Sequence, residues 1–123
     1  MKLSMQKILP HILLIDTNIV FVKKMMEELD FHQCHVTHVN TGAKAFSAFR
    51  KNCFDIIFCD VSLRGCISGF QVIKRLRLLE KVSGHHAHIV GMSNNPTDRQ
   101  KLFAFQTGMD IPITLQDARI KNE

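Results

Sequence analysis

Three side chains that can do chemistry stand where short apolar runs of this sequence end: Asp16, Asp60 and Ser93. A carboxylate can act as a nucleophile, and it is an oxygen ligand of the kind that Mg²⁺ prefers. A hydroxyl group both donates and accepts hydrogen bonds. What these groups do together depends on whether the fold brings them to one place.

Five apolar runs predict the strands that would position these side chains. The run at 11–15 is continuous, as in a strand that is buried on both faces, and the run at 35–39 is weaker. The last run is interrupted by Pro112, which suits a strand at the edge of a sheet. The five runs occupy residues 11–15, 35–39, 55–59, 88–92 and 110–115.

The segments between the runs have the apolar spacing of amphipathic helices. Asn18 is placed to cap the first helix, and Gly108 is placed to end the last one. The predicted helices cover residues 19–29, 42–49, 70–81 and, after a cap at Thr97 or Asp98, the residues up to Thr107.

Strands that alternate with helices predict an α/β fold with a doubly wound, five-stranded parallel sheet of the order 2-1-3-4-5. The 123 residues are enough for one domain and too few for two, with a core over about residues 10–116. Ligands of such sheets bind beyond the carboxyl ends of the strands. The side chains expected at that edge are Asp16, Thr17, Asp60, Ser93, Asn94, Thr114 and Leu115.

The composition is that of a soluble globular protein, with 46% hydrophobic and 22% charged residues. No apolar run approaches the ~18 residues of a membrane span and no signal peptide is evident, so we expect a cytoplasmic protein without membrane contact. The net charge of +5 includes one local cluster, formed by Lys74, Arg75, Arg77 and Lys81. A solvated helix face is the first interpretation of this cluster, and a face for an acidic protein partner is the second. The absence of Trp and Tyr does not favour nucleic-acid binding.

Cysteine and histidine spacing favours neither a disulfide framework nor a zinc site. The cysteines at 34, 53, 59 and 66 contain no C-x-x-C pair and suit small buried thiols in a reducing cytosol. The histidines at 32–38 and 85–88 suit a surface near loops better than a set of zinc ligands. A phosphate-binding P-loop, a dinucleotide fingerprint and a nucleophile elbow are all missing from the sequence, so we do not expect an enzyme.

Five features follow one another along the chain: HILLID, DIIFCD, LRGCISGF, HIVGMSN, and Gly108 at 15 residues after Ser93. Together they resemble the receiver domains of bacterial response regulators over about residues 10–116. The four segments resemble the family's first strand with its acidic end, its third strand with the phosphoacceptor, the loop that follows, and its fourth strand with a terminal hydroxyl residue. The fifth feature resembles the family's spacing from that hydroxyl residue to a glycine.

This resemblance implies a role for each of the three side chains. Asp60 would accept a phosphoryl group, Asp16 and Asp60 would hold Mg²⁺, and Ser93 would be the switch hydroxyl that binds the phosphoryl group. The resemblance also implies a stand-alone receiver in a two-component phosphorelay, supplied by a histidine kinase or a histidine phosphotransfer protein. Its output would be a protein–protein contact.

Two positions that carry charge in this family are neutral in this sequence. Thr17 stands where the second acidic residue would be, and Leu115 stands where a lysine would supply positive charge to the phosphoryl group. Arg64, in the loop after Asp60, is a candidate to replace that charge. The loss of two charged partners predicts weak or lost Mg²⁺ binding and phosphorylation that is slow, short-lived or absent. The alternative function is therefore a phosphorylation-independent pseudo-receiver, acting as a binding or dimerisation module.

The end of the sequence and the loop after the first strand bear on two further hypotheses. Only seven residues follow Gln116, which predicts a short or missing last helix. The sheet face left uncovered would suit a partner subunit, which makes a homodimer an open alternative. A flavodoxin-like flavin or redox carrier shares the architecture, but the loop DTNIV lacks the Ser/Thr/Gly-rich composition of a phosphate loop.

Overall fold

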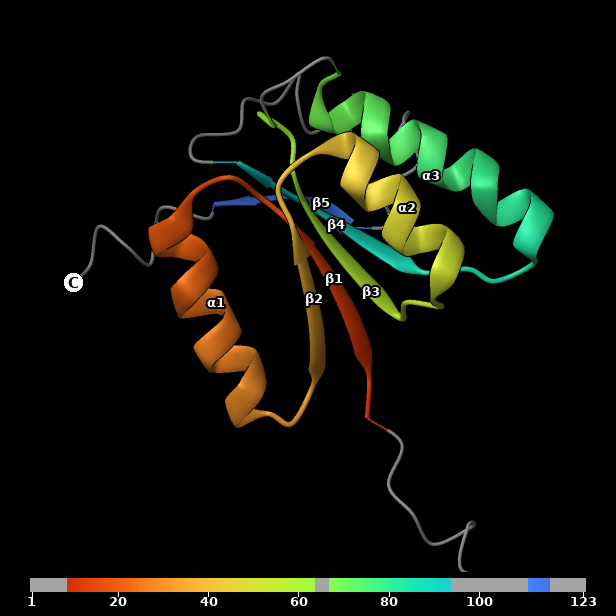
Figure 1. Cartoon of the computed structure of the whole chain (residues 1–123). Helices are drawn as coiled ribbons and strands as arrows, with labels where there is room; N and C mark the ends of the chain where they lie inside the picture. Colours follow the sequence, from red (N-terminus) through yellow and green to blue (C-terminus); the bar gives the residue numbers. More distant parts are fainter. Residues whose placement is uncertain (1–8, 64–66, 94–110, 116–123) are drawn as a thin grey trace, which may run out of the picture.

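The computed structural model describes residues 9–63, 67–93 and 111–115 of the chain. None of the helices in these ranges is long and apolar enough to cross a membrane. From residue 11 to residue 93, strands and helices alternate along the chain, as Figure 1 shows. The described elements are β1 (His11–Ile15), α1 (Ile19–Phe31), β2 (His35–Val39), α2 (Gly42–Lys51), β3 (Ile56–Asp60), α3 (Gly69–Ser83), β4 (His88–Ser93) and β5 (Ile111–Leu115).

All the strands pair in parallel within one sheet of the order β2-β1-β3-β4-β5, which confirms the predicted α/β fold. α1 covers one face of this sheet, and α2 and α3 lie side by side over the other face (Figure 1). A sheet covered on both faces requires strands that are apolar on both faces. β1 meets this requirement, because every residue from Ile12 to Ile15 is buried.

Two apolar layers hold the helices against the sheet. Successive side chains of a strand point to opposite faces. Leu13 and Ile15 accordingly belong to the layer shared with α2 and α3, while Leu14 belongs to the layer shared with α1. The larger layer includes Ala45, Phe46, Phe49, Ile57, Val72, Ile73, Leu76 and Ile89, and the smaller one includes Phe21, Val22, Met25 and Met92.

Local side-chain hydrogen bonds set where the helices begin and end. The side chain of Asn18 accepts a hydrogen bond from Phe21 N at 3.1 Å, which confirms the predicted cap of α1. Ser68 and Gln71 form a capping box at the start of α3, in which Ser68 N donates to Gln71 Oε1 at 2.8 Å. Gly84 has a φ of 78°, which glycine adopts without strain, and α3 ends there.

The strand boundaries differ slightly from the sequence prediction. β3 begins one residue later than predicted and includes Asp60, and β4 includes Ser93. Asp55 lies just before β3, where its carboxylate accepts a hydrogen bond from His11 N at 2.8 Å. Other predicted features lie outside the described residues: Arg64, Cys66, Asn94, the helix up to Thr107, Gly108 and the tail after Gln116.

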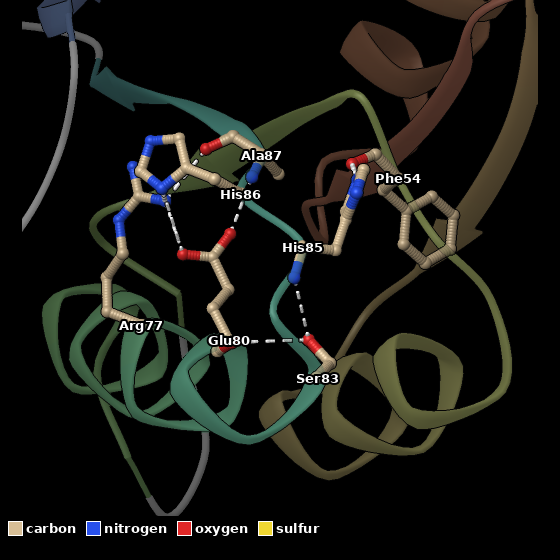
Figure 2. Close-up of polar contacts among 7 residues, drawn as sticks. All are labelled: Phe54, Arg77, Glu80, Ser83, His85, His86 and Ala87. Atoms are coloured by element: carbon tan, nitrogen blue, oxygen red, sulfur yellow. Dashed lines mark hydrogen bonds and ion pairs between the residues drawn. The ribbon is translucent and has the colours of Figure 1, made fainter.

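A network of buried charges joins the end of α3 to the start of β4 (Figure 2). The Glu80 carboxylate accepts hydrogen bonds from Arg77 Nη1 at 2.7 Å and from Ala87 N at 2.6 Å. Arg77 Nη1 also donates to the Ala87 carbonyl oxygen at 2.7 Å. The Glu80 and Arg77 side chains are only 7% and 15% exposed, so each charge relies on the other for compensation. His86 Nδ1 lies 3.5 Å from the same carboxylate.

From the sequence, the basic cluster of α3 is interpreted as a solvated helix face. For one of its four residues, Arg77, this interpretation is wrong. Arg77 is turned inward to Glu80, whereas Lys74, Arg75 and Lys81 are exposed. Helical spacing places Glu80 beside Arg77, but it could not predict the bond from Arg77 to the Ala87 carbonyl oxygen, because Ala87 lies beyond the end of α3.

Replacement of Glu80 by Ala should destabilise the fold by about 3 kcal/mol, because it leaves a buried guanidinium and a buried amide without their acceptor. The measurement is urea unfolding followed by circular dichroism. Glu28→Ala, on the exposed side of α1, is the matched control and should change stability by no more than about 0.5 kcal/mol. Equal stabilities for the two variants would mean that the contacts of Glu80 with Arg77 and Ala87 do not stabilise the fold.

Candidate functional site

The parallel register brings the predicted site residues to one edge of the sheet. Ile15 pairs with Cys59, so Asp16, the next residue after β1, comes level with Asp60. Asp60 pairs with Met92 of β4, and Ser93 is the next residue of that strand. Neighbouring strands lie about 4.8 Å apart. Asp16, Asp60 and Ser93 therefore end three adjacent strands, as the sequence predicted.

Asp16 is held in a buried position between the sheet and α1. Its side chain is fully buried. Its Oδ1 atom accepts a hydrogen bond from Asn18 N at 2.9 Å, and its own N donates to the Val39 carbonyl oxygen at 3.1 Å. Asn18 is also the cap of α1, so the start of this helix and the orientation of the Asp16 carboxylate are linked. The neighbouring Thr17 is exposed and brings no charge.

Asp60 closes β3 and starts a tight turn. Its Oδ1 atom accepts a hydrogen bond from Ser62 N at 2.9 Å. Val61 N donates to the Met92 carbonyl oxygen at 3.0 Å, which continues the pairing with β4 one residue beyond the strand. Asp60 is partly exposed, unlike Asp16. A partner at this edge can thus reach the Asp60 carboxylate, while the backbone beneath it is fixed.

Gly69, the first residue of α3, packs directly on the backbone of Asp60. A Cβ atom at this position would lie 2.1 Å from the Asp60 carbonyl oxygen and 2.6 Å from Val61 Cα. Both neighbours are main-chain atoms, which cannot move aside as the end of a side chain can. The glycine is therefore required for α3 to approach the residue that ends β3.

Cys59 lies next to Asp60 in the sequence, but its thiol is buried and unreactive. Its side chain is fully buried. Burial, and then the negative charges of Asp60 and Asp16, raise the pKa of the Cys59 thiol far above its usual range. The thiol therefore stays protonated at neutral pH, and in this form it is a poor nucleophile. Cys34 and Cys53 are free thiols as well, and no disulfide links the three described cysteines.

His38 is a residue near this site that the sequence prediction missed. It lies at the end of β2, and its Nε2 atom donates a hydrogen bond to the Asp16 carbonyl oxygen at 2.9 Å. The contact holds the end of β1 against the edge strand. The register of β1 and β2, which pairs Leu14 with His38, is the information that would have revealed it.

The oxygen atoms at this edge suit a hard cation that takes only one or two of its ligands from protein side chains. Asp16 and Asp60 offer two carboxylates at adjacent strand ends, and Thr17 offers only a hydroxyl group. Across the described parts of the chain, no three His, Cys, Asp or Glu side chains gather as a metal cage would need. Mg²⁺ commonly binds through one or two carboxylates and completes its shell with water and phosphate oxygens. The Asp16 and Asp60 pair fits that pattern, whereas the described histidines do not form a zinc site.

Position 115 also lies beside the site. Ser93 pairs with Leu115, so the last residue of β5 is the strand neighbour of the hydroxyl residue. The Asp16, Asp60 and Ser93 edge thus has neutral residues at 17 and at 115. Neither of these two positions therefore supplies a cation to the two aspartates.

Comparison with known proteins gives this arrangement a family context. The family model of the response regulator receiver domain matches residues 12–114. The receiver domain of the histidine kinase CKI1 from Arabidopsis thaliana, complexed with Mg²⁺, is 20% identical, with a TM-score of 0.78 over 92% of this chain and 88% of that chain. The chemotaxis protein CheY4 of Vibrio cholerae is 18% identical, with a TM-score of 0.79 over 94% of this chain and 96% of that chain.

A third similar structure is a complex. It contains the histidine phosphotransfer protein Ypd1 of Saccharomyces cerevisiae and the receiver domain of its downstream response regulator Ssk1. The match is 20% identical, with a TM-score of 0.76 over 94% of this chain and 87% of that chain. At these identities the solved structures show a shared fold.

Replacement of Gly69 by Ala should destabilise the protein by about 2–3 kcal/mol and displace Asp60, because the new methyl group would overlap main-chain atoms. Gly42→Ala is a matched control: Gly42 is likewise the first residue of its helix, but its Cβ would meet the side-chain atoms of Ile67 and Val72. Thermal unfolding of both variants provides the comparison. If Gly69→Ala were no more destabilising than Gly42→Ala, the close approach of α3 to Asp60 would not be a structural requirement.

Proposed function

This chain belongs to the response regulator receiver domain family of two-component signalling, and on that premise we propose that Asp60 accepts a phosphoryl group in a phosphorelay. The observation that carries the proposal is the position of Asp60 at the end of the central strand β3, between Asp16 and Ser93. The proposal treats the chain as one receiver domain with its core at about residues 10–116.

The chemistry follows from the three side chains. The partly exposed Asp60 carboxylate would attack the phosphorus of a phosphohistidine, so that an O–P bond forms while the N–P bond breaks and the imidazole keeps the electron pair. Asp16 and Asp60 would hold Mg²⁺, which when bound neutralises charge on the transferring oxygens. The Ser93 hydroxyl group would donate a hydrogen bond to a phosphoryl oxygen.

The partners of this reaction follow from the chemistry and the comparisons. A phosphohistidine donor is a histidine kinase or a histidine phosphotransfer protein, and the similar Ssk1 receiver domain was solved with the phosphotransfer protein Ypd1. The output would be a protein contact at the end of β4, because a phosphoryl group on Asp60 would draw Ser93 toward β3 and change the packing beyond it. No catalytic turnover of a substrate is part of the proposal.

A second candidate function has its own supporting observation. Thr17 is exposed and neutral beside Asp16, and Leu115 is neutral beside Ser93. Both substitutions lower the affinity of the site for Mg²⁺ and for a phosphoryl group. They favour a pseudo-receiver that binds its partner, or a second copy of itself, without phosphorylation.

Phosphorylation can be tested by intact mass spectrometry after incubation with acetyl phosphate and Mg²⁺. We expect the mass to rise by one phosphoryl group in the wild-type protein and in Asp30→Asn, a control at an exposed aspartate of α1. Asp60→Asn should show no increase, because an amide is not a nucleophile for this reaction. An unmodified wild-type protein at every Mg²⁺ concentration would reject phosphorylation at Asp60 and leave the pseudo-receiver.

The Mg²⁺ site can be tested by restoring a charge. Thr17→Asp should raise the affinity for Mg²⁺ at least about tenfold, since a third carboxylate beside Asp16 adds more than ~1.4 kcal/mol of attraction. Isothermal titration calorimetry measures this affinity directly. Thr37→Asp, at an exposed threonine of β2, has the same change of charge and should leave the affinity unchanged. An equal effect of the two variants would mean that Asp16 and Asp60 do not form the cation site.

A further inference from the structure

The two helical layers of this protein carry different charges. In the α2 and α3 layer, which forms one side of the molecule in Figure 1, Glu80 is the sole acidic residue. α1, on the other face of the sheet, has three acidic residues against two lysines. The basic residues of α2 and α3 are Lys44, Arg50, Lys51, Lys74, Arg75, Arg77 and Lys81.

The acidic residue of this layer does not neutralise its surface. The Glu80 carboxylate is buried and accepts hydrogen bonds from Arg77 and from the backbone of Ala87. The buried Glu80 and the partly buried Arg77 therefore compensate each other's charge. The other six basic residues of the two helices are exposed, so the described part of this face is uniformly positive.

Helix stability does not account for all of these charges. Arg50, Lys51 and Lys81 lie in last turns, where a cation interacts favourably with the helix dipole. Lys44 lies near the start of α2, at the end that disfavours a cation, and Lys74 lies in the middle of α3. Like charges on one surface repel, so this face lowers the stability of the folded protein. Binding of an oppositely charged partner would relieve that repulsion.

Two large apolar side chains are exposed on the same face. Leu78 is 56% exposed and Val82 is 89% exposed. They are four residues apart in α3, so they lie on one line along the helix surface. Lys74, one turn before Leu78, and Lys81, beside Val82, border this line with positive charge. An apolar line bordered by charge of one sign only is typical of an interaction surface.

Two hollows extend this surface at the ends of the helices. One has a volume of about 330 Å³ and is lined in part by Arg77, Lys81 and His86. The other, of about 140 Å³, is lined in part by Arg50 and Lys51 at the end of α2. His85 lines both, so the hollows are neighbours. They lie where β3 and β4 begin, at the opposite edge of the sheet from Asp60.

We infer that the outer face of α2 and α3 is a docking surface for an acidic, amphipathic segment of a protein partner. Aliphatic side chains of that segment would cover Leu78 and Val82, and its carboxylates would pair with the lysines beside them. Nucleic acid fits less well, because Leu78 and Val82 offer nothing to a phosphate backbone and no exposed aromatic ring of α2 or α3 offers stacking. Two aliphatic side chains are also too few for a membrane-inserting face. The surface is separate from Asp60 and does not depend on its phosphorylation.

The test is a selection of random displayed peptides on the immobilised wild-type protein. We expect the enriched peptides to be acidic and to contain aliphatic residues at helical spacing. The binding of one such peptide, labelled with a fluorophore, is then measured by anisotropy. Lys74→Glu/Leu78→Ser should bind it at least about tenfold more weakly, because one variant removes both a charge and an apolar contact.

Matched variants show whether the loss of binding is specific to the face of α2 and α3. Lys23→Glu/Phe31→Ser makes the same kind of change at exposed residues of α1 and should bind the peptide as the wild type does. Asp60→Asn should also bind normally, so that failure of the phosphorylation proposal leaves this one standing. Circular dichroism checks that every variant is folded.

Three results would overturn the inference. The first is enrichment of peptides without acidic character, and the second is equal loss of binding in the α1 variant. The third is tighter binding of wild-type protein to a single-stranded oligonucleotide or to phosphatidylserine vesicles than to the peptide, with that binding lost in Lys74→Glu/Leu78→Ser. This last result would assign the face to nucleic acid or to a membrane surface.

Discussion

The parallel pairing of β1, β3 and β4 is the constraint on which the rest of this structure depends. Strands that run in one direction all end at one edge, and the register places Asp16, Asp60 and Ser93 together there. A slip by one residue would move every apolar side chain of a strand to the wrong face. The packing that buries the core therefore also assembles the site, because both depend on the same register.

Polar contacts at the opposite edge support this register. The Asp55 carboxylate accepts a hydrogen bond from His11 N, at the start of β1, and the Glu80 carboxylate accepts one from Ala87 N, just before β4. Each contact fixes where a strand begins. Because the strands are short, a fixed beginning also determines where the far end lies. Asp55 and Glu80 thus help to position Asp16 and Asp60 at the other end of the strands.

Charged residues are distributed unevenly over the described part of the molecule. The carboxyl edge of the sheet concentrates two aspartates, and its neighbours at 17 and 115 are neutral. The protein has a net charge of +5, but none of its basic residues stands at position 17 or 115. Much of the described positive charge is spread over α2 and α3 instead, around an exposed apolar line. The docking proposed for this surface requires no change at Asp60, so the two proposals are independent of each other.

Apolar periodicity by itself determined the fold class, because burial on both faces of a parallel sheet leaves a continuous apolar run in the sequence. It also placed β1 and β2 correctly and indicated which residues would end the central strands. Asn18 could be predicted as a cap because capping involves residues close in the sequence. The tertiary structure alone decided the contact of Arg77 with the Ala87 carbonyl oxygen, the contact of His38 with Asp16, and the backbone approach that requires Gly69. In each case the two partners belong to separate segments, and a periodic pattern within one element contains no information about its neighbour.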